Sequence, residues 1–171
     1  MLFRSGATPL WDRDEPRFAT ATREMAQRGD WIVPTFNGEL RPDKSILAYW
    51  LMGIAYRIFG DGEFAARCFS GAAGTGAALL AYLLGKRMFD ARVGLLAGWM
   101  LALSPMLMIE SKLATVDAQL LFWLTCCFLL AWKLFETDGR LTAMGFWACL
   151  GMAILTKGPV AVAVEIGRAH V

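Results

Sequence analysis

The chain has 171 residues, of which 57% are hydrophobic and only 19% are charged, and its formal net charge is +2. Its mean hydropathy of +0.45 is too apolar for a typical soluble domain. Its seven Trp and eleven Phe are residues that collect at membrane interfaces. Composition therefore predicts a mostly helical integral membrane protein, and the absence of any Lys/Arg run argues against nucleic acid as a partner.

The two ends of the chain read as sequencing adapter rather than as protein. "LFRS" near the start and "IGRAHV" at the end are what a common short-read adapter region encodes on its two strands. We therefore expect residues 1–5 and 166–171 to be adapter, and residues 6–165 to be a partial transmembrane domain. The only histidine, His170, then has no catalytic role.

Residues 6–63 are predicted to form a loop outside the membrane that carries short juxtamembrane helices. The stretch "DEPRFATATREMAQRGD" has the apolar spacing of a short amphipathic helix. Asp14 suits its N-cap, Pro16 suits its first turn, and Gly29 ends it. A dense run of charge is thus expected at the membrane surface, not within it.

The rest of this loop is predicted to contain a turn and a second helix. "WIVPTFNGELRPDK" reads as extended chain with a turn at Asn37-Gly38. The apolar run Ser45–Phe59 is short and carries Arg57, so we expect an interfacial or half-buried helix there.

Four longer apolar runs follow, and we predict spans at about 64–84, 93–109, 118–135 and 141–164. At about 1.5 Å per residue, each is long enough, or nearly so, to cross a hydrocarbon core of about 30 Å. The glycines of "SGAAGTGAALL" lie inside the first run, where close packing of helices explains them better than a phosphate loop does.

The short connections between these spans predict their orientation. Lys86, Arg87 and Arg92 follow the first span, and Lys133 and Arg140 follow the third, as expected of cytoplasmic loops. The opposite face is then extracytoplasmic. At or outside that face lie Asp14, Glu15, Asp43, Lys44, Asp117 and Lys157.

Several of these charges have simple structural explanations when taken singly. Asp117 opens a span, where a helix dipole favours an acid by about 0.3–1 kcal/mol, and Lys157 ends a span, where a lysine can snorkel. The acid–base pair in "RPDKSILAYW" could be a solvated turn. Their convergence on one face with the acid pair Asp14-Glu15 instead predicts a site, because ionisable groups at membrane depth are costly. Such a cluster suits a phosphorylated amphiphile and proton transfer.

Several motifs occur together in a fixed order: Asp-Glu-x-Arg, "GDWIVPTFNG", an acid-Lys pair before "AYW", "TVD" and "LTKGP". In this order they resemble the lipid-linked-sugar-dependent glycosyltransferases of the GT-C class, which include bacterial aminoarabinose transferases of lipid A and protein mannosyltransferase-like enzymes. The resemblance covers Asp12–Val160. It implies an all-α, polytopic transmembrane bundle in the bacterial inner membrane, with its active site facing the periplasm.

The resemblance also implies a reaction and the residues that carry it. The family transfers a sugar, with inversion, from a polyprenyl phosphate to an acceptor, here a lipid resembling lipid A or a protein. The positions that match its catalytic acids are Asp14, Glu15 and Asp117. The positions that match its substrate-binding cations are Arg17, Lys44 and Lys157.

A divalent metal is the only cofactor that the resemblance raises, because some members bind one near the loop acids. The candidate ligands are Asp14 and Asp43. Asp43 replaces the usual Glu, and Ser-Ile follows Lys44 where the family pattern has two prolines, so the shorter acid reaches about one methylene less. Metal dependence stays open at this point.

Two other classes of function compete with this interpretation. A transporter or lipid flippase would place polar residues through the centres of the spans, and here the charges lie at the ends. A structural subunit without catalysis would leave the acid-rich loop motif unexplained. Because the family has a preceding helix and many further spans, we expect this piece alone to be inactive.

Overall fold

A computed structural model describes residues 9–10, 14–41 and 45–158 of the chain. The elements in chain order are α1 (Glu15–Arg28), β1 (Thr35–Phe36), β2 (Glu39–Leu40), α2 (Leu47–Phe59), α3 (Glu63–Met88), α4 (Ala91–Ala102), α5 (Pro105–Glu110), α6 (Asp117–Glu136) and α7 (Arg140–Lys157). The predicted adapter residues, Asp43, Lys44 and the stretch 159–164 of the predicted fourth span lie outside the described residues.

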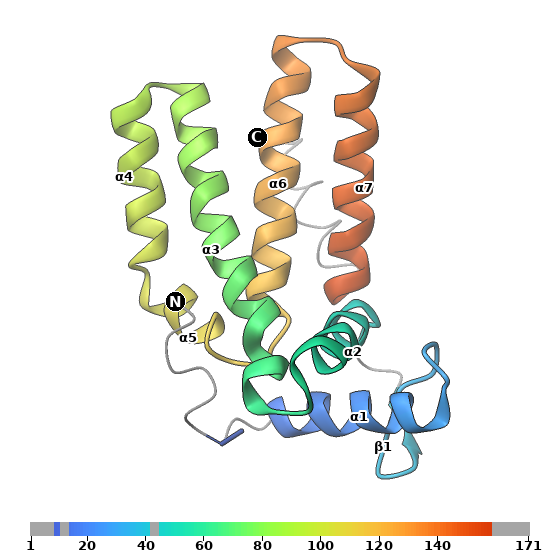
Figure 1. The fold of residues 1–171 in the computed structure, drawn as a ribbon. Coiled ribbons are helices and arrows are strands. Elements are labelled where there is room, and N and C mark those ends of the chain that lie inside the picture. The colour runs from blue at the N-terminus through green and yellow to red at the C-terminus, as the bar shows by residue number, and fades with distance from the viewer. Residues whose placement is uncertain (1–8, 11–13, 42–44, 159–171) are drawn as a thin grey trace.

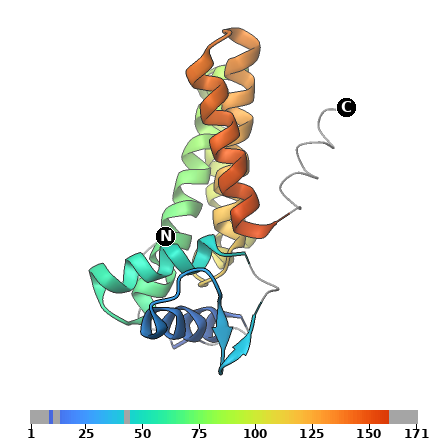
Figure 2. The ribbon, with the colours of Figure 1, turned by 90° about the vertical axis from the view of Figure 1, so that its right-hand side faces the viewer.

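The described chain is a bundle of long helices with a small layer across one end. Figure 1 shows α3, α4, α6 and α7 standing beside one another, while α1 and α2 lie across their lower ends. We call this the α1 end, and we call the opposite end, where residues 89–90 and 137–139 connect the helices, the far end. The view in Figure 2 confirms that α1, α2 and the hairpin belong to the α1 end.

Helix α1 forms where the sequence predicts an amphipathic helix. Pro16 lies in its first turn, and Gly29 ends it in the left-handed conformation, with φ at 68°. Its inner stripe, which includes Phe18 and Met25, is buried in one cluster with Tyr49 of α2. The amphipathic pattern therefore serves to pack α1 against α2 and the bundle.

The predicted turn at Asn37-Gly38 is confirmed and closes the hairpin of β1 and β2. Both residues have positive φ, 55° and 80°. The Glu24 carboxylate of α1 accepts hydrogen bonds from Thr35 Oγ1 at 2.5 Å and from the Asn37 N–H at 2.7 Å. These bonds, the one from Thr35 most of all, lower the pKa of Glu24 below its ordinary value. One acid thus fastens the hairpin to α1.

Helix α2 confirms the helix predicted over Ser45–Phe59. One of its faces packs on α1, whereas Trp50, Ile54 and Ile58 follow one another along the exposed face. Trp50 Nε1 donates to the carbonyl of Trp31 at 2.7 Å, which joins α2 to the loop after α1. The two-faced helix across the bundle end fits the interfacial or half-buried position that the sequence predicts (Figure 2).

Two helices of the described residues, α3 and α6, are long and apolar enough to cross a membrane. Small residues bring their neighbours close, as the sequence predicts. A Cβ added to Gly76 of α3 would lie 2.7 Å from the Phe122 ring of α6. A Cβ added to Gly94 of α4 would lie 2.6 Å from the backbone nitrogen of Lys86 in α3. Larger side chains at these glycines would therefore push the helices apart.

The predicted span at 93–109 is two helices rather than one. Helix α4 ends at Ala102, and α5 begins at Pro105. Ser104 has φ −59° and ψ 122°, which is the extended conformation that a following proline favours. Pro105 also lacks the N–H that a continuous helix would need. The chain consequently bends just before it reaches the α1 end.

Candidate active site

Asp14 directly precedes α1 and faces two guanidinium groups. Its carboxylate lies 4.0 Å from Arg17 Nη1 and 3.9 Å from Arg41 Nη2, and the side chain is 38% exposed. Asp14 is the N-cap residue, as the sequence predicts, but its side chain makes no capping bond to α1. The guanidinium of Arg41 lies over the rings of Phe18 and Phe36, at 5.0 and 5.9 Å from their centroids. The carboxylate is therefore held in place but remains accessible.

Arg41 is a residue of this site that the sequence reasoning missed. Its side chain is only 8% exposed. A buried arginine needs partners of opposite charge or an aromatic face, and here Asp14 and Phe18 provide both. The only signal in the sequence is its position directly after the hairpin, in "ELRPDK".

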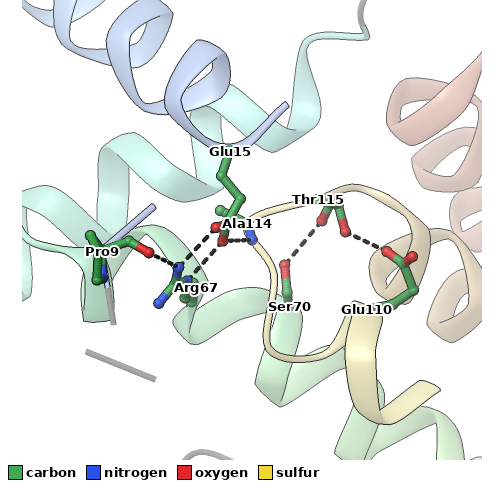
Figure 3. Close-up of polar contacts among 7 residues, drawn as sticks. All are labelled: Pro9, Glu15, Arg67, Ser70, Glu110, Ala114 and Thr115. Atoms are coloured by element: carbon green, nitrogen blue, oxygen red, sulfur yellow. Dashed lines mark hydrogen bonds and ion pairs between the residues drawn. The ribbon is translucent and has the colours of Figure 1, made fainter. Parts of the chain in front are cut away.

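Glu15, the second member of the acid pair, points into the protein and is fully buried. Arg67 of α3 donates from Nε to Glu15 Oε1 at 2.7 Å and from Nη2 to Oε2 at 2.8 Å (Figure 3). The backbone N–H of Ala114 donates to Oε1 at 2.7 Å. Arg67 is 1% exposed and also donates to the Pro9 carbonyl at 3.1 Å.

This bidentate pair joins three segments that are distant in the sequence: the start of α1, the first turns of α3, and the loop at 111–116. Arginine and carboxylate match each other in a planar, two-bond geometry, which fixes orientation as well as distance. The Glu15 carboxylate has no access to solvent, and its bonds hold the start of α1 against α3 and the loop.

The loop at 111–116 is fastened further along its length. Ser70 Oγ donates to the Thr115 carbonyl at 3.0 Å, and Thr115 Oγ1 donates to Glu110 Oε2 at 2.7 Å (Figure 3). Ser111 is fully buried and lies against Gly74 of α3. The loop leads directly into Asp117, so the same network that holds Glu15 also fixes the start of α6.

Asp117 and Lys157 meet at the α1 end, where α6 begins and α7 ends. Lys157 Nζ donates to Asp117 Oδ1, and the two side chains are 40% and 41% exposed. Gly158 follows with φ at 67°, and a Cβ added there would lie 3.9 Å from Ser45 Oγ. Ser45, just before α2, thus lies beside Gly158. The predicted acid–base pair at 43–44, just before Ser45, lies outside the described residues.

A pocket of about 260 Å³ opens beside Asp117. Its polar groups come from Asp117, Glu110 and Ser104, and its apolar walls include Leu107 and Leu121. Glu110 was missed in the sequence, where "MIESKLATVD" shows it only as an acid near the end of an apolar run. A pocket with apolar walls and few polar groups is typical of small-molecule sites.

The described residues do not fit a divalent metal well. They contain no group of three or more His, Cys, Asp or Glu side chains that could hold an ion. Asp14, one candidate ligand, lies 4.0 and 3.9 Å from guanidinium nitrogens of Arg17 and Arg41, and their positive charge disfavours a second cation beside it. Asp43, the other candidate, lies outside the described residues.

Comparison with known families decides what kind of protein carries this site. A profile of the dolichyl-phosphate-mannose-protein mannosyltransferase family matches residues 2–168, almost the whole chain. The chain belongs to this family. The resemblance to lipid-linked-sugar glycosyltransferases that the motifs indicate is thereby confirmed.

Two relatives with similar sequences are bacterial arabinosyl transferases. The undecaprenyl phosphate-α-4-amino-4-deoxy-L-arabinose arabinosyl transferase of Aeromonas hydrophila is 33% identical over 165 residues, which are 92% of this chain and 30% of the relative. The enzyme of the same name from Pseudomonas aeruginosa is 32% identical over 154 residues, 87% of this chain and 28% of the relative. The chain thus spans less than a third of the length of these relatives.

Solved structures agree with the sequence relatives. The crystal structure of ArnT from Cupriavidus metallidurans in the apo state matches with a TM-score of 0.89 at 29% identity, over 96% of this chain and 32% of ArnT. ArnT bound to undecaprenyl phosphate matches with a TM-score of 0.84 at 30% identity, over 95% and 31% of the two chains. The predicted all-α, polytopic transmembrane fold of the GT-C type is confirmed by this likeness and by the long apolar helices.

Proposed function

We propose that this chain forms part of the active site of a membrane glycosyltransferase, one that moves a sugar from a polyprenyl-phosphate donor to a lipid or protein acceptor. The observation that carries the proposal is the gathering of Asp14, Asp117 and Lys157 at one end of the bundle, tied together by the Glu15–Arg67 pair. Among its relatives, ArnT has been crystallised with undecaprenyl phosphate, which supports the donor class.

We place the α1 end at the periplasmic face of a bacterial inner membrane. The support is the distribution of charge: Lys86, Arg87, Lys133 and Arg140 lie at the far end of the described helices. Basic residues are enriched in cytoplasmic connections of membrane proteins, which would leave the α1 end outside.

On the donor side, the reaction breaks the bond between the anomeric carbon and a phosphate oxygen. The electron pair leaves with the phosphate, so negative charge grows on the leaving group and needs fixed cations nearby. Arg17, Lys44 and Lys157 are the candidates. Lys157 pairs with Asp117 in the structure. An incoming donor phosphate would pair with Lys157 in place of Asp117, and the Asp117 carboxylate would then be free to turn toward the pocket.

On the acceptor side, an oxygen of the acceptor attacks the anomeric carbon from the face opposite the leaving phosphate, which inverts the configuration. The attacking hydroxyl must lose its proton, and we assign the Asp14 carboxylate as the base that accepts it. Asp117 assists by orienting the substrates. Through its bonds to Arg67 and Ala114, Glu15 fixes the positions of Asp14 and Asp117 relative to each other.

The distribution of charge within the helices does not favour the transporter alternative. No charged residue lies between Arg67 and Lys86 in α3, or between Asp117 and Lys133 in α6. Ionisable groups inside the membrane are the usual mark of an ion or substrate pathway. The charged groups of the two described helices that could cross a membrane instead lie toward their ends.

The substitution Asp14→Asn in the gene product that carries this chain tests the proposal. We expect sugar transfer from a polyprenyl-phosphate donor to fall by roughly 100-fold or more, because a general base contributes about that much. Transfer is measured with labelled donor in solubilised membranes, with lipid and peptide acceptors offered in parallel. Membrane insertion is followed by protease protection.

Asp30→Asn is the matched control, since it removes the same charge just beyond the other end of α1. Its activity should stay within about twofold of the unchanged protein, as is usual for exposed sites away from the chemistry. An Asp14→Asn variant with unchanged transfer to both acceptors would refute the assignment.

A further inference from the structure

A second pocket lies at the far end of the bundle, away from the candidate active site. Its volume is about 310 Å³, and it is lined by Leu83, Lys86 and Arg87 of α3 and by Leu129 and Lys133 of α6. These residues come from the last turns of the two helices that are long and apolar enough to cross a membrane. Figure 1 shows these ends of α3 and α6 at the top of the bundle, opposite α1.

The pocket carries a surplus of positive charge. Arg87 Nε donates to Glu136 Oε2 at 2.5 Å, and Glu136 also accepts a bond from Trp132 Nε1 at 2.8 Å. Lys86 Nζ lies 5.9 Å from the centroid of the Tyr82 ring. Within the described part of the chain, neither Lys86 nor Lys133 forms an ion pair. Of the three cations that line the pocket, only Arg87 is paired with a carboxylate of the described residues.

Basic residues here also have a simpler explanation. Cations at helix C-termini interact favourably with the helix dipole, and basic connections set the orientation of membrane proteins. Neither effect requires the cations to surround a pocket with apolar walls. Leu83 is 44% exposed at its edge, while Leu129 is buried at 7%. A cationic rim above an apolar wall is the complement of a molecule with an anionic head and apolar tails.

We propose that this far-end pocket binds an anionic diacyl phospholipid of the bilayer. The headgroup phosphate would accept hydrogen bonds from Lys86 and Lys133, and the first methylenes of the acyl chains would lie against Leu83 and Leu129. Basic pockets between transmembrane helices are a known kind of site for anionic headgroups. Bound there, the lipid bridges α3 and α6 at the end where no buried ion pair of the described residues joins them.

The test uses the gene product that carries this chain, purified in detergent and titrated with short-chain phosphatidylglycerol or phosphatidylcholine, with bound lipid counted by native mass spectrometry. We expect phosphatidylglycerol to bind and phosphatidylcholine to bind much more weakly. The double substitution Lys86→Gln and Lys133→Gln should weaken phosphatidylglycerol binding roughly 30-fold, since each basic side chain near an anionic lipid contributes roughly fivefold.

Arg92→Gln with Arg140→Gln is the matched control, because it removes two charges at the same end outside the pocket. It should leave the affinity within about twofold. Three outcomes would overturn the proposal: equal weakening by the control pair, equal binding of the two lipids, or full displacement of phosphatidylglycerol by inorganic phosphate. Displacement by phosphate would mean that the site takes any small anion.

Discussion

Two of the carboxylate–cation pairs at the α1 end are opposite in character. Glu15 and Arg67 are 0% and 1% exposed, and each carries further hydrogen bonds to the backbone. Asp117 and Lys157 are 40% and 41% exposed and lie beside a pocket. The two pairs are linked through the loop at 111–116, so one of them fixes the place of the other.

The two pairs differ in exposure, and exposure decides whether an ion pair mainly stabilises the fold or can exchange a partner for a ligand. A buried pair is costly to break because a single remaining charge would stay buried without its partner. An exposed pair contributes little to stability, and either member can exchange its partner for a ligand. The same kinds of side chain thus join segments in one place and lie open to a pocket in the other.

The largest expected effect comes from breaking the buried pair. Glu15→Gln should destabilise the fold by about 3–5 kcal/mol, the usual cost of leaving a buried charge unpaired. Thermal unfolding in detergent, followed by Trp fluorescence, measures this loss. Combining Glu15→Leu with Arg67→Leu should be less destabilising than Glu15→Leu alone, because no charge remains buried. A Glu15→Gln variant as stable as the unchanged chain would contradict the structural role.

Breaking the exposed pair should change binding instead of stability. Lys157→Gln is expected to weaken binding of a polyprenyl phosphate by roughly tenfold or more, because a charge-assisted bond to phosphate is lost. The free energy of unfolding should change by less than about 1 kcal/mol. Binding is measured with a fluorescent polyprenyl phosphate in the gene product that carries this chain. Lys112→Gln, in the exposed part of the neighbouring loop, is the control. Equal effects of the two substitutions would remove Lys157 from the site.

A smaller effect should appear at Glu24, which fastens the hairpin beside Arg41. Its pKa in the folded protein lies below the ordinary 4.5, so its contribution to stability is present above that pH and is lost as the pH falls through the lowered value. Glu24→Gln should lower the unfolding midpoint by roughly 2–4 °C at pH 7. The difference from the unchanged chain should shrink below pH 4.5. Glu39→Gln in the same hairpin serves as the control, and a difference independent of pH would contradict the assignment.

The smallest effect is expected at the exposed pair between α1 and the start of α3. Arg23 Nε lies 2.8 and 2.7 Å from the two carboxylate oxygens of Asp61. Both side chains are largely exposed, so Arg23→Gln should cost only about 0.2–1 kcal/mol, and added salt should reduce the difference. Thermal unfolding at two salt concentrations measures it. A cost as large as that of Glu15→Gln would show that exposure does not separate the pairs.

Local patterns were sufficient to predict much of the fold. The amphipathic spacing and flanking Pro16 and Gly29 predicted α1, and Asn37-Gly38 predicted the hairpin turn, because these signals act between residues a few positions apart. The apolar runs predicted the long helices. Pro105 interrupts one of these runs, and the single helix predicted there is two helices in the structure.

Contacts between distant residues could not be predicted in the same way. Glu15 meets Arg67 across 52 residues, and nothing local in either stretch indicates the partner. Arg41 and Glu110 were missed for the same reason. The fold brings Arg41 to Asp14, and it brings Glu110 to the pocket beside Asp117. The family motifs did single out acids that the fold gathers at the α1 end, since such motifs carry information about the fold that periodicity lacks.

The bond between the Ala114 N–H and Glu15 also determines when α1 can complete its contacts during synthesis of the chain. These two residues are 99 positions apart, so α1 emerges from the ribosome long before its final partner does. At roughly 5–20 residues per second, the nascent chain waits roughly 5–20 s for that partner. Until then Glu15 can engage Arg67 alone. Helix α1 therefore reaches its final place only after the loop at 111–116 has emerged.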